Sequence, residues 1–304
     1  MAPIFRIAVI QLYVKVSIPL RPAENFAKAV KFIRDAAAQE CNLAVLPECH
    51  LTNCPMDDPR FVPLCTDWET YLHKYQALAK ECNICIVPGS IVQTIPDTAP
   101  HSDRPKLENV TYFISNTGQI LGSYTKKNLW GPMESKLIRS SGNAPHRVIQ
   151  TPLGPVGLLL CWDLAFPEAC RELVYQGAKI IIMPIFLTRH HLSDAGHRWN
   201  PSGICAFVDN ILAARACENT CAMVCANAGG PSQHYFGHSQ ITLPYVGPMA
   251  RLGTSTEGIM VADLDMAILD DAEANINVRA DLTREDWHYS YSRRDGQIQP
   301  GAKL

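Results

Sequence analysis

The chain alternates short runs of apolar residues with longer segments in which apolar residues recur at helical spacing. After Pro22, for example, Phe26, Val30, Ile33 and Ala37 are spaced to share one face of a helix. Short apolar runs bounded by polar turns are typical of buried strands. The pattern therefore predicts strands and amphipathic helices in alternation, which is the α/β class with helices packed outside sheets.

The predicted elements follow one another along the chain without a linker, a charge block or an internal repeat. Strands are expected at 7–11, 43–46, 84–87, 111–116, 120–124, 148–151, 156–160, 180–183, 222–226, 239–243 and 258–263, and helices at 22–37, 68–78, 167–176 and 204–215. One domain over residues 1–270 is expected. The polar and aromatic segment 271–304 then forms a tail that we expect to dock on the domain or on a partner subunit.

Three side chains able to take part in catalysis stand at the ends of predicted strands. Glu48, Lys126 and Cys161 each follow a short extended run, and Cys161 comes just ahead of the helix that begins at Pro167. In open α/β sheets the chemistry lies at the carboxyl ends of strands. Neighbouring helix N-termini there favour the thiolate form of a cysteine. A lone cysteine in an apolar run is usually a small core residue, and it is the company of Glu48 and Lys126 that favours a reactive thiol at Cys161.

In this order the three residues resemble the nitrilase, or carbon–nitrogen hydrolase, superfamily. The resemblance covers roughly Ile4 to Asp265 and includes flanking residues: Gln11, Asn109, Glu134, Phe166-Pro167-Glu168 and Arg215-Ala216-Cys217-Glu218-Asn219. It implies an α-β-β-α sandwich of two stacked mixed sheets with outer helices, whereas periodicity alone does not give the number of sheets. It also implies a Glu-Lys-Cys triad.

The resemblance implies a role for each catalytic residue. Cys161 attacks the substrate and forms a thioester, which replaces one difficult step with two easier ones. Glu48 takes the thiol proton, delivers it to the leaving group and then activates water. Lys126 holds the oxyanion, with the Trp162 N–H as a second donor, and Glu134 orients the lysine and the substrate. No cofactor and no metal are expected.

Two residues beside the triad leave a choice. Lys126 is preferred over Lys127 because it stands where the family has its lysine, two residues after Tyr124. Alternation along an extended segment also sends the two lysine side chains to opposite faces. Asp163 has two interpretations, as a cap of the following helix or as a group that tunes the thiol.

Departures from the family pattern bear on the substrate. Trp162 after the cysteine is similar to true nitrilases, whereas the continuation 163–168 is similar to the amidase branches, although Ala165 replaces an arginine frequent there. The loop after residue 183 stands where relatives line the substrate pocket, so Phe186, Thr188 and Arg189 are candidate substrate contacts. Arg189 either pairs with a carboxylate or lies on the surface.

Three functions are compatible with these residues. The first is an amidase or carbamoylase that releases ammonia from a small carboxamide or N-carbamoyl compound. The second is a nitrilase that converts a nitrile to an acid, and the third is a non-catalytic relative that keeps the fold for binding. The third would normally lack a triad residue, and none is missing here. Asp163 and Glu134 favour the amidase over the nitrilase.

Composition narrows the partners and the compartment. The net charge is −2 with mixed signs, so no basic face for nucleic acid is expected. No apolar stretch approaches the ~18 residues needed to cross a bilayer, and the N-terminus does not read as a signal peptide. We therefore expect a cytoplasmic enzyme with a small-molecule substrate. In the superfamily that the chain resembles, C-terminal segments commonly take part in subunit contacts, so the resemblance implies a homodimer or a higher homo-oligomer.

The chain contains 12 cysteines. In a chain of this length without an export signal, most of them should be reduced core residues rather than a disulfide framework. The spacings of Cys82 and Cys85 and of the cysteines in 217–225 do not form a zinc site. Cys49 and Cys54 bracket the loop after Glu48, where they either lie near the site or serve packing.

Overall fold

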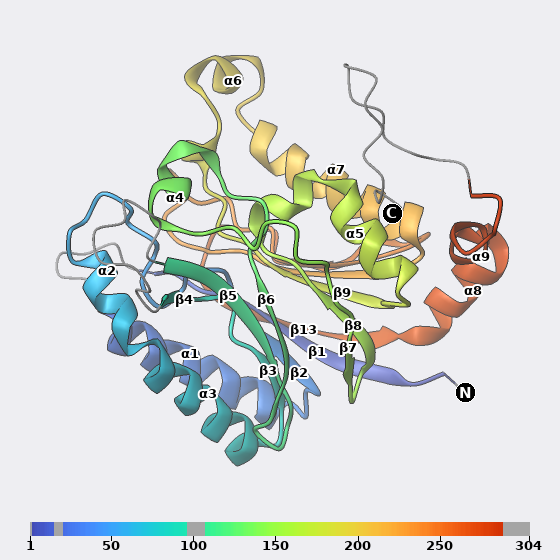
Figure 1. The fold of residues 1–304 in the computed structure, drawn as a ribbon, viewed down its shortest axis with the longest axis horizontal. Coiled ribbons are helices and arrows are strands. Elements are labelled where there is room, and N and C mark those ends of the chain that lie inside the picture. The colour runs from blue at the N-terminus through green and yellow to red at the C-terminus, as the bar shows by residue number, and fades with distance from the viewer. Residues whose placement is uncertain (1, 15–20, 96–106, 288–304) are drawn as a thin grey trace.

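The computed structural model describes residues 2–14, 21–95 and 107–287. Within these ranges two β-sheets lie face to face, and a layer of helices covers the outer face of each (Figure 1). This is the α-β-β-α sandwich of two mixed sheets that the sequence predicts, and that prediction is confirmed.

The first sheet has seven strands among the described residues, in the order β13-β1-β2-β3-β5-β4 with β6 paired to β5. Its strands are β1 (Ile4–Gln11), β2 (Leu43–Val45), β3 (Cys85–Val87), β4 (Ile91–Thr94), β5 (Leu107–Ile114), β6 (Ile120–Thr125) and β13 (Gly258–Asp265). Strands β1, β2 and β3 run parallel, and the other pairs are antiparallel.

The second sheet has six strands in the part of the chain described, in the order β12-β11-β10-β9-β8-β7. They are β7 (Ile149–Thr151), β8 (Gly154–Leu158), β9 (Ile180–Pro184), β10 (Ala222–Ala226), β11 (Gln240–Leu243) and β12 (Gly247–Arg251). The central strands β8, β9 and β10 are parallel, so their carboxyl ends meet at one edge of the sheet.

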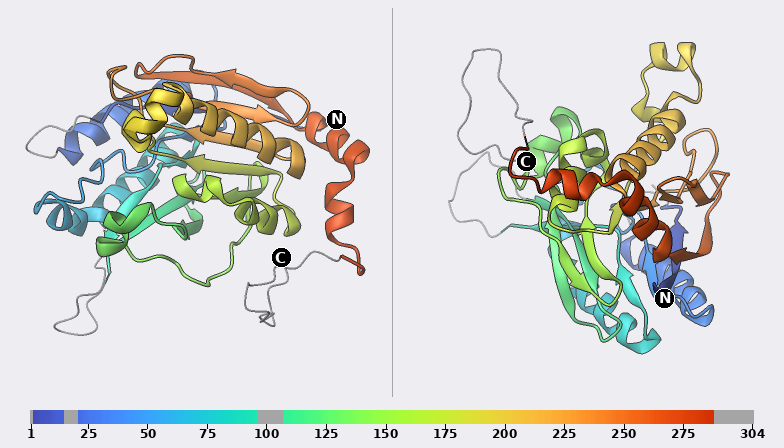
Figure 2. Two further views of the ribbon diagram at one scale, coloured as in Figure 1. Left: turned by 90° about the horizontal axis from the view of Figure 1, so that it is seen from above. Right: turned by 90° about the vertical axis from the view of Figure 1, so that its right-hand side faces the viewer.

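Helices α1 (Pro22–Ala38) and α3 (Trp68–Cys82) cover the first sheet, and α5 (Pro167–Tyr175) and α7 (Gly203–Asn219) cover the second (Figures 1 and 2). Five further α-helices lie in the described ranges: α2 (Phe61–Leu64), α4 (Gly131–Leu137), α6 (Asp194–Trp199), α8 (Met266–Ile276) and α9 (Val278–Leu282). No helix in the described ranges is long and apolar enough to cross a membrane.

Alternation along each strand separates the layers of the core. In β1, Ile7 and Val9 pack between the two sheets, whereas Ala8 and Ile10 pack toward the outer helices α1 and α3. Successive side chains of a strand point to opposite faces, so one strand serves both cores. The apolar runs in the sequence are continuous rather than alternating because both faces of the sheet are buried.

Several elements are absent from the sequence-based assignment: β4, β12, α2, α4, α6, α8 and α9. Each is either short or near the edge of the fold. Helix α4 has 7 residues and β12 has 5, and each contains a proline. Neither is long enough to show a recognisable helical or strand pattern of apolar residues.

The segment after Asp265 begins with two helices at one end of the sandwich (Figure 2). Helix α8 runs across residue 270, the predicted end of the domain. In α9, Arg279 donates hydrogen bonds to the carbonyl oxygens of Val174 (3.4 Å), Ala178 (2.8 Å) and Thr220 (3.3 Å). Residues 288–304, which include Tyr289 and Tyr291 of the predicted tail, lie outside the described residues.

Candidate active site

Cys161 stands on a sharp turn at the carboxyl edge of the second sheet. Strand β8 ends at Leu158, and Cys161 opens a 3-10 turn (Cys161–Ala165) that leads into α5. Its φ angle is 45°, a left-handed conformation that is sterically unfavourable for a residue with a Cβ. The side chain is 4% exposed and lines a cavity. The local backbone is therefore bent so that the thiol leaves the line of the strand.

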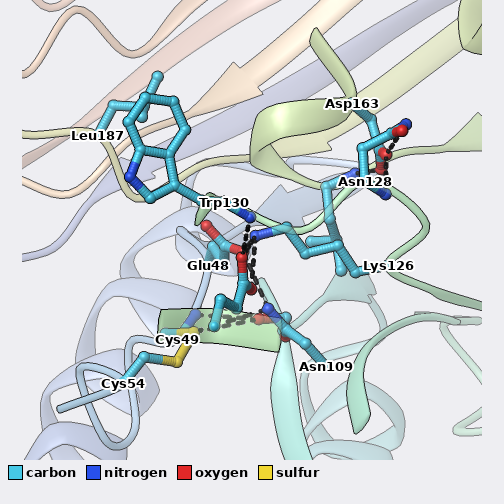
Figure 3. A network of polar contacts seen from close by, with 12 residues as sticks. Glu48, Cys49, Cys54, Asn109, Lys126, Asn128, Trp130, Asp163 and Leu187 are labelled. Carbon is cyan, nitrogen blue, oxygen red and sulfur yellow. Dashed lines mark hydrogen bonds and ion pairs between the residues drawn. A yellow bond between two sulfur atoms is a disulfide. The ribbon is translucent and has the colours of Figure 1, made fainter. Parts of the chain in front are cut away.

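Lys126 lies between two carboxylates at the end of β6. Its Nζ donates to Glu48 Oε1 at 3.0 Å and to the two oxygens of Glu134 at 2.8 and 3.1 Å (Figure 3). The exposed fractions of these residues are 2% for Lys126, 3% for Glu48 and 7% for Glu134. Glu48 comes from the loop after β2, and Glu134 comes from the first turn of α4. Three separate segments thus meet in one buried ionic cluster.

The cluster fixes the charge of the lysine. Burial by itself lowers the pKa of Lys126, but the negative charges of Glu48 and Glu134 outweigh it and raise that pKa. Burial raises the pKa of Glu134 above its ordinary value, although Lys126 acts in the opposite direction. Lys126 is therefore a permanent cation in a site with little water.

The same surroundings keep the thiol protonated. Burial raises the pKa of Cys161 well above its ordinary value, and the charge of Glu48 raises it further, while Lys126 and the N–H of Phe186 act against this rise. The expectation that nearby helix N-termini favour the thiolate is therefore wrong for the resting site. Because two carboxylates already face one ammonium, a third negative charge, on the sulfur, is disfavoured in the resting site.

Asn109, on β5, connects Glu48 to Lys126. Its side-chain Nδ2 donates to Glu48 Oε1 at 2.9 Å (Figure 3). Its backbone carbonyl oxygen accepts the backbone N–H of Lys126 at 2.9 Å. The N–H of Glu48 also donates to the carbonyl oxygen of Ile185, just beyond β9 of the other sheet, at 3.3 Å. Asn109 enters the sequence analysis only as a flanking residue, because its pairing with Glu48 depends on which strands become neighbours.

The cluster opens into a cavity of about 280 Å³. Its lining combines the four predicted catalytic residues with a mostly apolar wall: Glu48, Lys126, Glu134 and Cys161, together with Cys49, Asn53, Cys54, Met56, Trp130, Phe186 and His191. A cavity of this size holds only a small molecule. Burial lowers the pKa of His191, so this ring is neutral near pH 7.

The predicted substrate contacts separate into two groups. Phe186 lines the cavity, whereas Thr188, Arg189, Trp162 and Asp163 are not among the described residues that line it. The Arg189 guanidinium is held by the carbonyl oxygens of Ser232 (2.9 Å) and Pro201 (3.4 Å). Thr188 bonds the ring of His191 at 3.0 Å, and the ring of Trp162 packs 4.2 Å from that of Trp130, centroid to centroid.

Cys49 and Cys54 form a disulfide that belongs to the cavity wall (Figure 3). The other ten cysteines are free. Both bonded residues have positive φ angles, 52° for Cys49 and 44° for Cys54. The spacing of the two residues predicts neither these conformations nor the bond. The sequence predicts only that the pair lies near the site or serves packing. The bond closes the loop that begins directly after Glu48.

Comparison with known proteins places this geometry among hydrolases. The sequence profile named Carbon-nitrogen hydrolase matches residues 6–273. Omega-amidase NIT2 of Homo sapiens is 28% identical over 91% of this chain and 96% of its own length. The nitrilase and fragile histidine triad fusion protein NitFhit of Caenorhabditis elegans is 27% identical over 81% of this chain, which spans about half (54%) of that protein.

A solved structure with the same fold is a mutant amidase from Nesterenkonia sp. AN1. It superposes with a TM-score of 0.70 at 24% identity and covers 91% of this chain and 98% of its own. In that protein the acetamide moiety of fluoroacetamide is covalently attached to the active site cysteine.

Proposed function

The chain belongs to the carbon–nitrogen hydrolase family and is a thiol-dependent amide hydrolase, and we propose that it cleaves a small amide or N-carbamoyl compound through an acyl-enzyme on Cys161. One observation carries the assignment of residues. One small cavity is lined by Cys161, Glu48 and Lys126. There the Glu48 carboxylate raises the pKa of the thiol and accepts a hydrogen bond from the ammonium at 3.0 Å.

The first half of the reaction forms the thioester. Glu48 takes the proton of the Cys161 thiol as the sulfur attacks the carbonyl carbon, and the carbonyl electrons move to oxygen. The tetrahedral intermediate then collapses, the C–N bond breaks, and Glu48 returns the proton to the departing nitrogen. A thiol that is protonated at rest suits this order, because its proton is the one that the leaving ammonia requires.

The second half hydrolyses the thioester. Water takes the place of ammonia, Glu48 removes its proton, and the hydroxide adds to the acyl carbon. The C–S bond breaks and the thiolate recovers the proton from Glu48. The carboxylate therefore acts alternately as base and acid, and the acid product leaves a site returned to its starting state.

Lys126 stabilises the negative oxygen in both halves. Its charge is fixed by Glu48 and Glu134, so the ammonium does not lose its proton to the intermediate. The N–H of Trp162 in the first turn after Cys161 supplies a second donor, because the first N–H groups of a helical turn lack partners within it. Removal of one such donor typically costs about 100- to 1,000-fold in rate.

A nitrile remains the alternative substrate. Attack of the thiol on a nitrile gives a thioimidate, which has to take up water before ammonia departs, whereas an amide reaches the thioester directly. The amidase relatives favour the amide, and Trp162 is the feature that favours the nitrile. A matched pair, R-CONH₂ and R-CN, assayed for ammonia release after treatment with a chelator, separates the two.

The expected result is a higher kcat/KM for the amide or the N-carbamoyl analogue. Cys161→Ala should abolish turnover, whereas Cys217→Ala, which removes an exposed free thiol, should leave it unchanged. Intact-protein mass spectrometry with a slow substrate should show one acyl adduct on Cys161. Faster conversion of the nitrile to the acid would reverse the assignment of substrate, and an adduct on another cysteine would remove the assignment of the nucleophile.

The proposal extends to compartment and assembly. Ten of the 12 cysteines are free, which is consistent with a reducing compartment such as the cytoplasm, whereas the Cys49–Cys54 disulfide is unusual for one. Large apolar side chains are exposed at Trp199 (84%), Tyr245 (56%) and Val246 (50%), and such residues favour a homo-oligomer that covers them. We retain a single hydrolase domain with a docking tail after residue 270. Light scattering coupled to gel filtration tests the oligomeric state.

A further inference from the structure

Asp163 is fully buried and accepts four hydrogen bonds. Its Oδ2 accepts the hydroxyl of Tyr124 at 2.7 Å and the N–H of Leu160 at 2.9 Å. Its Oδ1 accepts the N–H and the Nδ2 of Asn128 at 3.1 and 2.8 Å (Figure 3). The carboxylate is thereby saturated with donors. Asp163 does not cap α5, whose N-cap residue is Phe166 without a side-chain hydrogen bond.

The donors belong to the two segments that carry the catalytic groups. Tyr124 and Asn128 are the second residues before and after Lys126, and Leu160 directly precedes Cys161. The Tyr124 hydroxyl also accepts the N–H of Lys127 at 3.2 Å. The lysine segment follows a strand of the first sheet and the cysteine segment follows a strand of the second. One carboxylate thus connects both segments across the sandwich.

The connection bears directly on the strained turn of the nucleophile. Asp163 receives the N–H of Leu160 through its side chain and donates its own N–H to the carbonyl oxygen of Leu160 at 3.0 Å. These two bonds enclose Cys161, whose φ angle is 45°. A non-glycine residue keeps such a conformation only where its surroundings over-determine it.

An apolar residue would fill the space of Asp163 at a lower desolvation cost. Desolvation of a carboxylate is costly, and replacing buried charged groups by well-packed apolar ones is often neutral or stabilising. An apolar side chain would not, however, provide hydrogen bonds to both catalytic segments at once. The buried carboxylate is therefore better explained by the geometry that it imposes than by its contribution to stability.

We propose that Asp163 is a positioning residue that sets the distance between the Cys161 thiol and the Lys126 ammonium. The inference rests on the proposed function, because the lysine stabilises only an oxyanion that forms within its hydrogen-bonding reach. A displacement of about 1 Å at such a site can cost about 100-fold in rate. Asp163 is not among the described residues that line the cavity, so it acts through its partners rather than on the substrate.

The first test is Asp163→Asn. We expect kcat for a small amide to fall by about 10- to 100-fold, while KM changes by less than about threefold because the cavity wall is unaltered. The double variant Asp163→Asn with Asn128→Asp exchanges the amide and the carboxylate across the side-chain contact. The backbone N–H of residue 128 keeps its direction and loses its carboxylate acceptor, so the double variant should recover part of the lost kcat, about threefold.

A matched control separates positioning from general destabilisation. The Glu273 carboxylate, on α8, accepts the Thr220 hydroxyl at 2.5 Å and the N–H of Arg279 at 2.9 Å, and neither partner lines the cavity. Glu273→Gln should lower Tm and leave kcat within about twofold of wild type. A kcat loss in Glu273→Gln equal to that in Asp163→Asn, at equal loss of Tm, would overturn the proposal.

Two further measurements keep the proposal testable. If Asp163→Asn does not fold, Tyr124→Phe removes one donor and keeps the ring, and kcat should fall by about three- to tenfold. Alkylation of Cys161 by iodoacetamide, followed by mass spectrometry, needs no turnover and should be at least about fivefold slower in Asp163→Asn. Wild-type values in both measurements would overturn the role of Asp163. If the wild-type enzyme cleaves no amide, yet its Cys161 is alkylated faster than that of Asp163→Asn, the result would instead count against the proposed function.

Discussion

The negative charge of Glu48 raises the pKa of the Cys161 thiol, although the two residues follow strands of different sheets. Glu48 and the thiol proton are thus brought together by the stacking of the layers. The resting site holds a neutral thiol beside a carboxylate, which differs from a site that stores a thiolate beside a cation. This arrangement leads to predictions that a stored thiolate would not.

Replacement of Glu48 by glutamine removes the base and changes the size of the side chain very little. We expect Glu48→Gln to lower kcat by about 100- to 10,000-fold. Because the charge of Glu48 raises the pKa of Cys161, its loss should lower that pKa. Titration of thiolate absorbance at 240 nm, with Cys161→Ala as the blank, should show the transition at lower pH in Glu48→Gln than in wild type.

The matched control is Glu81→Gln, which alters a carboxylate that is 57% exposed and pairs with Arg34 on the surface. It should leave both kcat and the thiol titration unchanged. A titration in Glu48→Gln that moves to higher pH, or does not move, would contradict the arrangement of charges described for the site.

The two adjacent lysines should differ in effect. Lys126→Met keeps the length of the side chain and removes the charge, so kcat should fall by about 100- to 1,000-fold. It should also lower stability, because Glu48 and Glu134 lose their shared partner in a buried site. Lys127→Met should change both quantities little. Equal loss of activity in the two variants, measured by steady-state kinetics, would show that the catalytic lysine is misassigned.

His50 should make the protein sensitive to acid. The ring is buried, its Nε2 bonds the Tyr75 hydroxyl at 2.6 Å, and burial lowers its pKa to about 4. An unfolded chain binds a proton on this histidine below pH ~6.5, whereas the folded chain binds it only near pH 4. The contribution of neutral His50 is therefore complete above pH ~6.5 and is lost as the pH falls toward 4, by about 3 kcal/mol in total.

Urea unfolding between pH 7 and pH 4.5 measures this effect. His50→Gln, which does not titrate in this range, should show a flatter decrease of the free energy of unfolding than wild type. His146, whose pKa burial also lowers to about 4, should contribute a second part of the slope. Parallel slopes for wild type and His50→Gln would refute the assignment to this residue.

Reduction of the disulfide between Cys49 and Cys54 should weaken both the fold and the cavity wall. A cross-link that closes so short a loop is worth about 2 kcal/mol in the chain-entropy treatment. A phosphine reductant should raise the number of alkylatable thiols in the denatured protein from ten to all 12 cysteines. KM should increase because both cysteines line the cavity.

The control for reduction is the double variant Cys49→Ser with Cys54→Ser. It should have the KM of the reduced enzyme and should not respond to the reductant. If the reductant changes this variant as much as it changes wild type, the effect comes from another thiol.

The strand ends could be predicted from sequence because they depend on local patterns. Glu48, Lys126 and Cys161 each follow a short extended run, and their order matches the family. Asn109 and the contacts of Asp163 were not predictable in this way. They depend on which strands become neighbours and on the stacking of two sheets, and neither property leaves a period in the sequence.

Arg189 illustrates the opposite case. Its position in the loop after β9 is consistent with a substrate contact, and the loop does reach the cavity through Phe186 and His191. The guanidinium nevertheless turns to the carbonyl oxygens of Ser232 and Pro201. The direction of a long side chain depends on acceptors far away in the chain, so the loop could be placed from sequence and the arginine could not.

Because the site is shared between the two sheets, activity depends on how the sheets are aligned with each other. A strand advances about 3.3 Å per residue, so a slip of one sheet past the other by a fraction of a residue would carry the thiol out of hydrogen-bonding reach of Glu48. Ile7 and Val9 from one sheet and Ile182 from the other pack between the layers. Substitutions at these positions can therefore abolish activity from a distance, although no residue that touches the substrate has been replaced.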